Sequence, residues 1–359
     1  MTNQDSKKQI EDLLMLTAQN AASDLHLSPG HYPTIRVDGR LIPLANTNIL
    51  DTEHLNSMLL DFLSDEQKNR FNVEKDIDFS YEIDKKVRCR VNVYQTRSGL
   101  AATFRLITEH IRTIEELNLP QSLKAFSKLS QGFVLVVGPN GHGKTTTMAA
   151  LIDLINHERA EKIVTIEDPI EYIYTPDKSI IDQRELGNDM ISFNRAIRAT
   201  FRENVNVILV GEMRDYETMS AAVTAAETGH LVFASLHTNN ASQTIERIVD
   251  SFPASQQPQI ISQLSNTVSG IISQRLIPRI KGGMIPAVEV LVADTGVRTI
   301  IRDKKFQQLN LAIETGAEAG MMSMSKYLAK LVLDKEISIE QAEFYSLNIN
   351  ELRNAIGER

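Results

Sequence analysis

The sequence predicts an α/β protein made of two domains and a helical C-terminal region. Between residues 133 and 237, apolar strand-like segments alternate with helix-like segments, and this alternation predicts a parallel sheet with crossover helices. Before about residue 110, shorter strand-like segments and a helical stretch predict a smaller α/β domain. From about Ser255 onward the pattern is mostly helical. We therefore place an N-terminal domain, a linker, a larger α/β domain and a helical region at residues 1–108, 109–119, 120–292 and 293–359.

The N-terminal domain begins with a charged amphipathic helix over roughly residues 6–22. This helix lacks the uninterrupted apolar core of a signal peptide, and no later window reaches membrane-spanning length, so we expect no direct membrane insertion. Helical sequence also covers about residues 51–71. The strand-like segments of this domain are LHLS, TIRVDGRLIPL, DFSYEI, VRCRVNVYQTR and LAATFRLI.

A polar connector, TEHIRTIEELNLP, ends at Pro120 and precedes the larger domain. The strands predicted there are Phe133 to Val137, EKIVTIED, SIIDQREL, NVILVGE and HLVFASLH. Helices are predicted at TTTMAALIDLI and at about residues 193–202 and 215–228. Beyond Ser255 only PAVEVLVA has the pattern of a strand.

Composition limits the classes of function that fit this chain. Its 359 residues, 42% of them hydrophobic, are enough for two sizeable cores. Acidic residues outnumber basic ones by 46 to 38, and no basic run stands out, so nucleic acid is a poor candidate partner. Cys89 is the only cysteine, which excludes an intramolecular disulfide and a cysteine-rich zinc cluster and fits a reducing cytoplasm.

The segment GPNGHGKTT fits the phosphate-binding pattern G-x-x-x-x-G-K-[ST] between a predicted strand and a predicted helix. Its glycines let backbone N–H groups point at phosphates, and the helix N-terminus adds positive partial charge. Lys144 is expected to reach the β- and γ-phosphates of ATP, and the Thr145 hydroxyl to bind Mg²⁺. The nucleotide-binding residues predicted here are Gly138, Pro139, Asn140, Gly141, His142, Gly143, Lys144, Thr145 and Thr146.

Carboxylates follow two of the predicted strands at the edge where α/β sheets bind ligands. Glu167, with Asp168 and Glu171 close behind it, follows one strand and can orient an attacking water. Glu212 follows the second strand, after a glycine at the usual aspartate position, and can act on Mg²⁺, in part through water. The alternative is that such acids only cap the next helices.

Two histidines, His230 and His237, bracket a third strand, and a histidine near the phosphates can sense the γ-phosphate. Alone, either would be structural. Arg90 and Arg105 lie on strand-like segments of the N-terminal domain, and a guanidinium can stabilise phosphate charge. Exposed arginines more often pair with surface acids.

Five segments carry a resemblance over nearly the whole chain, from Ala22 to about Ser323. Besides the phosphate loop they are ASDLHLSPG, TIEDPIEY, ILVGEMRD and AAETGHLVFASLHTNNASQTIERIVDSFP. They strongly resemble the PilT-like type IV pilus retraction ATPases, within the secretion ATPase superfamily. The resemblance implies a PAS-like N-terminal domain, a RecA-like P-loop ATPase domain and a homo-hexameric ring. It also implies a cytoplasmic motor, peripheral at the inner membrane, that acts on the pilus through an inner-membrane platform protein.

The resemblance also implies catalytic roles. Glu167 matches the family's catalytic glutamate and Glu212 its Walker B glutamate. His230 and His237 match its histidine box. Arg90 and Arg105 match N-domain arginines that approach the nucleotide.

Three readings stay open within this resemblance. The first is a motor that powers pilus retraction. The second is an accessory, PilU-like ATPase that acts through a paralogous partner motor. The C-terminal tail of the chain resembles that of the PilU-like ATPases. The third is another secretion or conjugation ATPase, or a nucleic-acid translocase on the same core. GVRTIIRD, at residues 296–303, is similar to the AIRNLIRE motif of retraction ATPases and keeps Arg298, Ile301 and Arg302.

Overall fold

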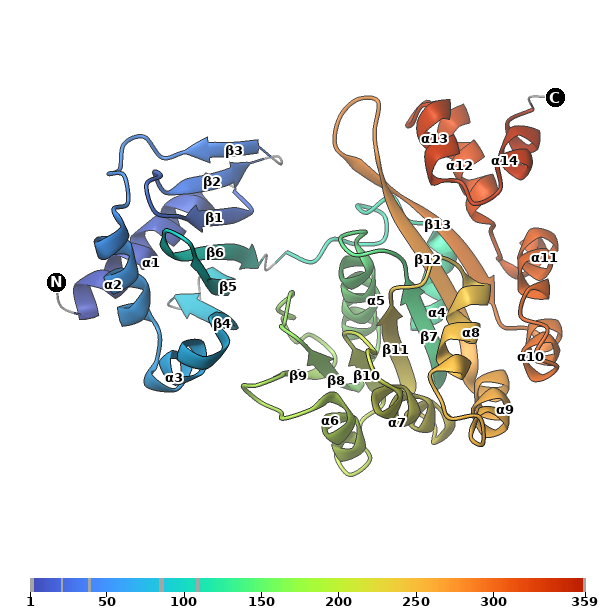
Figure 1. Cartoon of the computed structure of the whole chain (residues 1–359). Helices are drawn as coiled ribbons and strands as arrows, with labels where there is room; N and C mark the ends of the chain where they lie inside the picture. Colours follow the sequence, from blue (N-terminus) through green and yellow to red (C-terminus); the bar gives the residue numbers. More distant parts are fainter. Residues whose placement is uncertain (1–2, 21, 38–39, 84–86, 108–109, 358–359) are drawn as a thin grey trace. The chain divides into compact units, whose positions relative to one another are not determined.

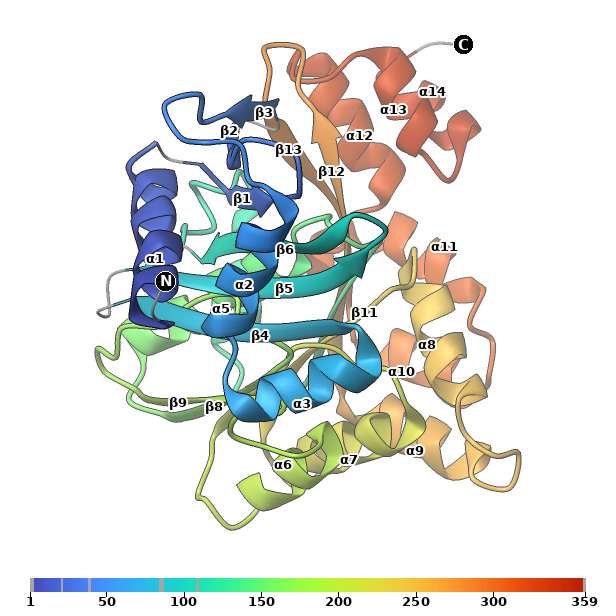
Figure 2. The same cartoon turned by 60° about the vertical axis from the view of Figure 1, so that its left-hand side comes forward.

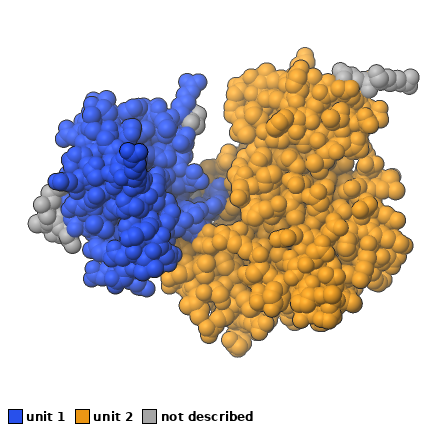
Figure 3. Space-filling model, in the orientation of Figure 1, with its two compact units in different colours: residues 1–109, 169–173 blue, residues 110–168, 174–359 orange. Residues whose placement is uncertain are grey.

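A computed structural model of the chain describes residues 3–20, 22–37, 40–83, 87–107 and 110–357 (Figure 1). The chain forms two compact units (Figure 3). Unit 1 comprises Met1–Glu109 and Pro169–Ile173, and unit 2 comprises His110–Asp168 and Tyr174–Arg359. The predicted boundary at residues 108 and 109 lies outside the described residues.

Unit 1 is a six-stranded antiparallel sheet in the order β3-β2-β1-β6-β5-β4. Helices α1 and α2 pack against each other and against this sheet (Figure 2). The elements are α1 (Asn3–Gln19), β1 (Asp24–Leu27), β2 (Thr34–Val37), β3 (Arg40–Pro43), α2 (Thr52–Phe62), α3 (Asp65–Glu74), β4 (Asp76–Ile83), β5 (Val87–Thr96) and β6 (Gly99–Ile107). The small α/β domain predicted from the pattern is thus present.

The helical stretch predicted over residues 51–71 is two helices, because Ser64 starts a new one. Its hydroxyl accepts a hydrogen bond from the Gln67 N–H, and the Gln67 side chain accepts one from the Ser64 N–H. This reciprocal cap satisfies two backbone donors that a helix start leaves unpaired. Asp51 caps α2 in a similar way by accepting from the His54 N–H.

Unit 2 contains a seven-stranded sheet in the order β13-β12-β7-β11-β10-β8-β9. The five strands predicted to be parallel are parallel. The strands are β7 (Gly132–Val137), β8 (Lys162–Glu167), β9 (Ile180–Glu185), β10 (Val207–Val210), β11 (Leu231–Leu236), β12 (Val268–Pro278) and β13 (Met284–Val292). The α/β class is confirmed.

Helices bury both faces of this sheet. Phe133, Leu135 and Val137 of β7 belong to a core that includes residues of α7, α8 and α9, whereas the alternate residues Val134 and Val136 are equally buried on the other face. The helices are α4 (Lys124–Ser127), α5 (Lys144–Glu158), α6 (Phe193–Thr200), α7 (Tyr216–Glu227), α8 (Ala241–Asp250) and α9 (Gln257–Thr267). A short 3₁₀ helix, Gln121–Leu123, precedes α4.

The C-terminal region is helical, as predicted. It contains α10 (Thr295–Arg302), α11 (Gln308–Thr315), α12 (Met324–Leu333), α13 (Ile339–Tyr345), α14 (Ile349–Ile356) and a 3₁₀ turn at Ala317–Ala319. Arg298, in the segment similar to the retraction motif, donates to the carbonyls of Ser265 and Asn266 at the end of α9. Within the described ranges, every helix is too short or too polar to cross a membrane.

Strand β12 contradicts the mostly helical pattern expected after Ser255. Val268–Pro278 pairs parallel to β7 and antiparallel to β13. Its apolar run is short and has no clear period, so the run alone does not distinguish a buried strand from a helix. The free edge of β7 decides the outcome, because pairing satisfies the backbone groups of both segments.

Gly270, in the middle of β12, is required by packing. A Cβ atom there would lie 2.1 Å from a ring carbon of Phe126 and 3.1 Å from the Leu291 carbonyl oxygen. We expect Gly270→Ala to lower the free energy of unfolding by about 1–3 kcal/mol, because the close-packed core must shift. Urea denaturation measures this change.

Gly296→Ala is the comparison variant, since Gly296 lies in α10 and an added Cβ would closely approach only the Asp294 carboxylate, the N-cap of that helix, at 3.2 Å. Alanine favours a helix, so the change there should stay within about 1 kcal/mol. Equal destabilisation by the two substitutions would contradict the packing argument.

Candidate nucleotide-binding site

The phosphate loop joins β7 to α5, as the motif predicts. Gly138, Gly141 and Gly143 have φ angles of 145°, 75° and 78°, a region that favours glycine. A Cβ atom on Gly138 would lie only 2.2 Å from the Gln274 carbonyl oxygen of β12. Gly143 is the N-cap of α5, so the loop ends at a helix N-terminus, where anions bind.

Lys144 folds back over its own loop. The side chain is buried, and its ammonium donates hydrogen bonds to the carbonyl oxygens of Gly138, at 2.9 Å, and Pro139, at 3.0 Å. It also lies 3.2 Å from Nδ1 of His237. These acceptors hold a positive charge inside the loop, where a phosphate group can replace them.

Glu167 is the last residue of β8, and Glu212 follows β10, its parallel neighbour, so both lie at the carboxyl edge of the sheet. Glu167 is 4% exposed and accepts a 2.6 Å hydrogen bond from the Thr165 hydroxyl. Gly211 lies against it, because a Cβ at Gly211 would be 3.4 Å from the Glu167 Cα. The position of the usual aspartate therefore lies directly beside Glu167.

His237 connects the phosphate loop to Glu212. Its Nε2 lies 3.2 Å from Oε2 of Glu212. Because the Lys144 ammonium can only donate to Nδ1, the imidazole carries its proton on Nε2 and donates to the carboxylate. One imidazole ring thus links the loop cation to the strand-end acid.

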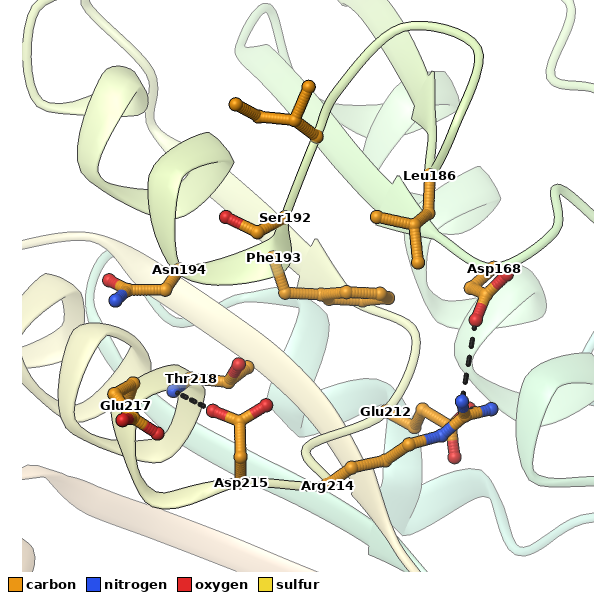
Figure 4. A pocket seen from close by; sticks show the side chains of 11 residues that line it. Asp168, Leu186, Ser192, Phe193, Asn194, Glu212, Arg214, Asp215, Glu217 and Thr218 are labelled. Atoms are coloured by element: carbon orange, nitrogen blue, oxygen red, sulfur yellow. Dashed lines mark hydrogen bonds and ion pairs between the residues drawn. The ribbon is translucent and has the colours of Figure 1, made fainter.

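Arg214 completes this group. Its guanidinium pairs with Glu212 and lies 3.5 Å from the Asp168 carboxylate (Figure 4). Burial raises the pKa of Glu212, but hydrogen bonds from Arg214 and His237 outweigh it, and the pKa lies below its usual value. Glu212 is therefore held as a carboxylate.

A cavity of about 470 Å³ opens beside Arg214 (Figure 4). Asp168 and Glu212 contribute to it, together with the apolar side chains of Leu186 and Phe193. No residue of the phosphate loop lines it, so it is not the phosphate position itself.

His230 is not part of this group in the chain. It precedes β11, whereas His237 follows it, and a strand of this length separates the two by roughly 20 Å. Its Nδ1 lies 3.0 Å from the Ala225 carbonyl oxygen, and its ring contacts Phe201. The expectation that both histidines lie near the phosphates is therefore wrong for His230.

The two candidate arginines lie in unit 1, each beside an acid. Arg90 is 2.9 Å from Asp78, and Arg105 is 2.8 Å from Asp24. Asp24 is buried, whereas the Arg105 side chain is 68% exposed. Burial raises the pKa of Asp24, but the hydrogen bonds from Ser23 and Arg105 lower it by more, so the pKa lies below its usual value.

The donor groups at the loop fit Mg²⁺. The candidate ligands are the Thr145 hydroxyl in the first turn of α5 and the Glu212 carboxylate, and both present the oxygen atoms that this hard cation prefers. Mg²⁺ at nucleotide sites usually takes one or two such protein ligands and completes its shell with phosphates and water.

Gln274 and the tie of His142 to β12 were not predicted. Gln274 donates to the His142 carbonyl oxygen, at 2.9 Å, and accepts from the Thr147 hydroxyl, at 2.7 Å. The His142 Nδ1 accepts the Leu276 N–H at 2.8 Å. Gln274 is a polar residue within an apolar run, which is the only sign in the sequence of a special role. The pattern after Ser255 predicts helix for that run, so it does not place Gln274 beside the loop.

We expect Asp24→Asn to lower the free energy of unfolding of unit 1 by about 1–3 kcal/mol at pH 7, because the buried carboxylate that pairs with Arg105 and Arg36 is replaced by a neutral amide. The folded-state pKa of Asp24 is depressed, so its contribution is present above the usual pKa of about 3.9 and is lost as pH falls through the folded value. Urea unfolding at pH 7 and pH 3 should show the difference between the two proteins shrinking in acid.

Asp78→Asn is the matched control, since the pair of Asp78 with Arg90 is exposed on both sides. Its effect at pH 7 should stay below about 1 kcal/mol. A difference for Asp24→Asn that persists unchanged at low pH would contradict the assignment of the charge.

Comparison with known proteins identifies the family. The family described as Type II/IV secretion system protein matches residues 3–326. The type IV pilus retractation ATPase PilT of Pseudomonas aeruginosa is 42% identical over 333 residues, covering 93% of this chain and 96% of that protein. The type IV pilus ATPase PilU of the same organism is 36% identical over 346 residues, covering 96% and 90%.

A crystal structure of the pilus retraction motor PilT with bound ADP has a TM-score of 0.87 to this chain. It is 40% identical, and the match covers 95% of this chain and 98% of that one. The resemblance to the retraction ATPases is thus confirmed. This chain belongs to the Type II/IV secretion system protein family.

Proposed function

We propose that this chain is an ATP-hydrolysing motor that powers retraction of type IV pili. The observation that carries the proposal is the connected group Lys144, His237 and Glu212, which joins the phosphate loop to an acid at the end of a neighbouring strand. The relatives named as retraction ATPases match nearly the whole chain.

In this proposal ATP binds with its phosphates on the loop. The loop N–H groups and the α5 N-terminus face the phosphates, and Lys144 exchanges its carbonyl acceptors for β- and γ-phosphate oxygens. Thr145 and Glu212 hold Mg²⁺, which supplies charge neutralisation on the phosphates. Glu167 orients the water that attacks the γ-phosphate, and His237 keeps Glu212 oriented.

The assembly around this site is also a proposal. We assign residues 1–108 to a PAS-like domain, 109–119 to a linker, 120–292 to a RecA-like ATPase domain and 293–359 to a helical region. Six copies form a ring at the cytoplasmic side of the inner membrane, and the ring acts on the pilus through its platform protein. Arg90 and Arg105 exchange their acids for nucleotide phosphates as the ring closes.

Glu167→Gln tests the enzymatic part. A neutral amide cannot accept the proton of the attacking water, so steady-state ATP hydrolysis should fall by about a hundredfold or more, while nucleotide affinity stays within about threefold. The Thr165 hydroxyl can still donate to the amide oxygen, which preserves the local structure. Phosphate release and binding of a fluorescent ADP analogue are the measurements.

Glu158→Gln is the matched control, because it neutralises an exposed acid at the end of α5 and should leave both quantities unchanged. Hydrolysis by Glu167→Gln at the wild-type rate would exclude Glu167 as the catalytic carboxylate.

The accessory role is a second candidate, favoured by the PilU relative, which matches 96% of this chain. Restoring the protein to a strain that lacks it and every paralogous retraction ATPase separates the two. A main motor should restore retraction by itself, scored by fluorescently labelled pili. Recovery that needs a co-expressed paralogue would favour the accessory role.

A further inference from the structure

We propose that Gln274 is a positioning residue that holds the phosphate loop in its nucleotide-binding shape. The inference rests on the proposed nucleotide site and concerns affinity before any hydrolysis takes place. Gln274 is 3% exposed and lies in β12, more than a hundred residues after the loop motif.

The contacts of Gln274 span Lys144 from both sides. Its amide Nε2 donates to the carbonyl of His142, two residues before the lysine, and its Oε1 accepts from the hydroxyl of Thr147, three residues after it. Both bonds have good lengths, at 2.9 and 2.7 Å. A single buried side chain therefore fixes the end of the loop relative to the first turn of α5.

The strand register explains why these groups meet. Pairing of β12 with β7 ends at Ser273 opposite Val137, the last residue of β7. Beyond that point the β7 chain becomes the phosphate loop, and β12 continues alongside it. The polar groups that would have paired with a longer strand instead bond the loop, as the Leu276 N–H does with His142 Nδ1.

His142 strengthens this tie as a neutral acceptor. Burial first, and then the positive charges of Arg275 and Lys144, lower its pKa below the usual value. The unprotonated Nδ1 is the form that can accept the Leu276 N–H. His142 thus anchors the loop to β12 through its side chain.

A loop held in this way needs less ordering when phosphate binds, and preorganisation of that kind raises affinity. We therefore expect Gln274→Leu, which keeps the volume and removes both hydrogen bonds, to weaken ADP binding by about tenfold. The KM for ATP should rise by a similar factor, while kcat changes by less than about threefold.

Ser273→Ala is the matched control. Ser273 is the neighbouring buried residue of β12, and its hydroxyl bonds Glu289 at 3.1 Å, away from the loop. It removes one buried hydrogen bond from the same strand and should leave ADP affinity within about twofold of the wild type. The assay is titration of the full chain with a fluorescent ADP analogue at fixed Mg²⁺.

Loss of affinity in Gln274→Leu but not in Ser273→Ala supports the proposal. Unchanged affinity in Gln274→Leu, or equal losses in both, would overturn it. If Gln274→Leu does not fold, Thr147→Val and Thr147→Ser decide, because only the serine keeps the hydroxyl that orients the Gln274 amide. Weaker binding by the valine variant alone supports the proposal, and equal binding by the two overturns it. Failure of the wild type to bind ADP would instead refute the proposed function.

Discussion

The buried ammonium of Lys144 is the constraint on which the candidate site depends. A cation removed from water needs acceptors on every N–H, and here they come from two loop carbonyls and one imidazole. The carbonyls require the loop to curl, and the curl requires glycine at Gly138 and Gly143. The imidazole requires β11 to end beside β7, which the parallel register of these two strands ensures. The shape of the loop and the register of β7 with β11 thus both serve to place acceptors around the Lys144 ammonium.

A chain of charged and polar side chains extends outward from Lys144. His237 donates its single ring N–H, on Nε2, to Glu212, and Arg214 pairs with that carboxylate and lies near Asp168. Two acids, one arginine and one lysine thus belong to one connected group, in which the negative and positive charges are equal in number. The members of the group come from the loop and from the ends of three strands, so the group depends on the arrangement of the whole sheet edge.

Local sequence patterns predicted those structural elements that depend only on residues close together in the sequence. The phosphate loop, the strand that ends at Glu167 and the strand before Glu212 are all encoded within short segments, and the structure contains them. Strand β12 could not be predicted, because it forms only by pairing with β7, more than a hundred residues earlier. Gln274 was missed for the same reason. The position of His230 was predicted wrongly because His230 and His237 are close in sequence but lie at opposite ends of the extended strand β11. The acids beside Arg90 and Arg105 also come from other strands, and a single sequence does not show which strands pair with each other.

The register of β12 bears on the order in which the chain matures during synthesis. The bond from Gln274 to the His142 carbonyl joins residues 132 positions apart. At the usual pace of translation, of about 5–20 residues per second, the loop leaves the ribosome many seconds before the strand that braces it. Until β12 arrives, β7 has an open edge on one side and the loop has no brace. A nascent chain that already contains every recognisable nucleotide motif therefore still lacks the strand that braces the loop, and its exposed strand edge is a point at which it can mispair.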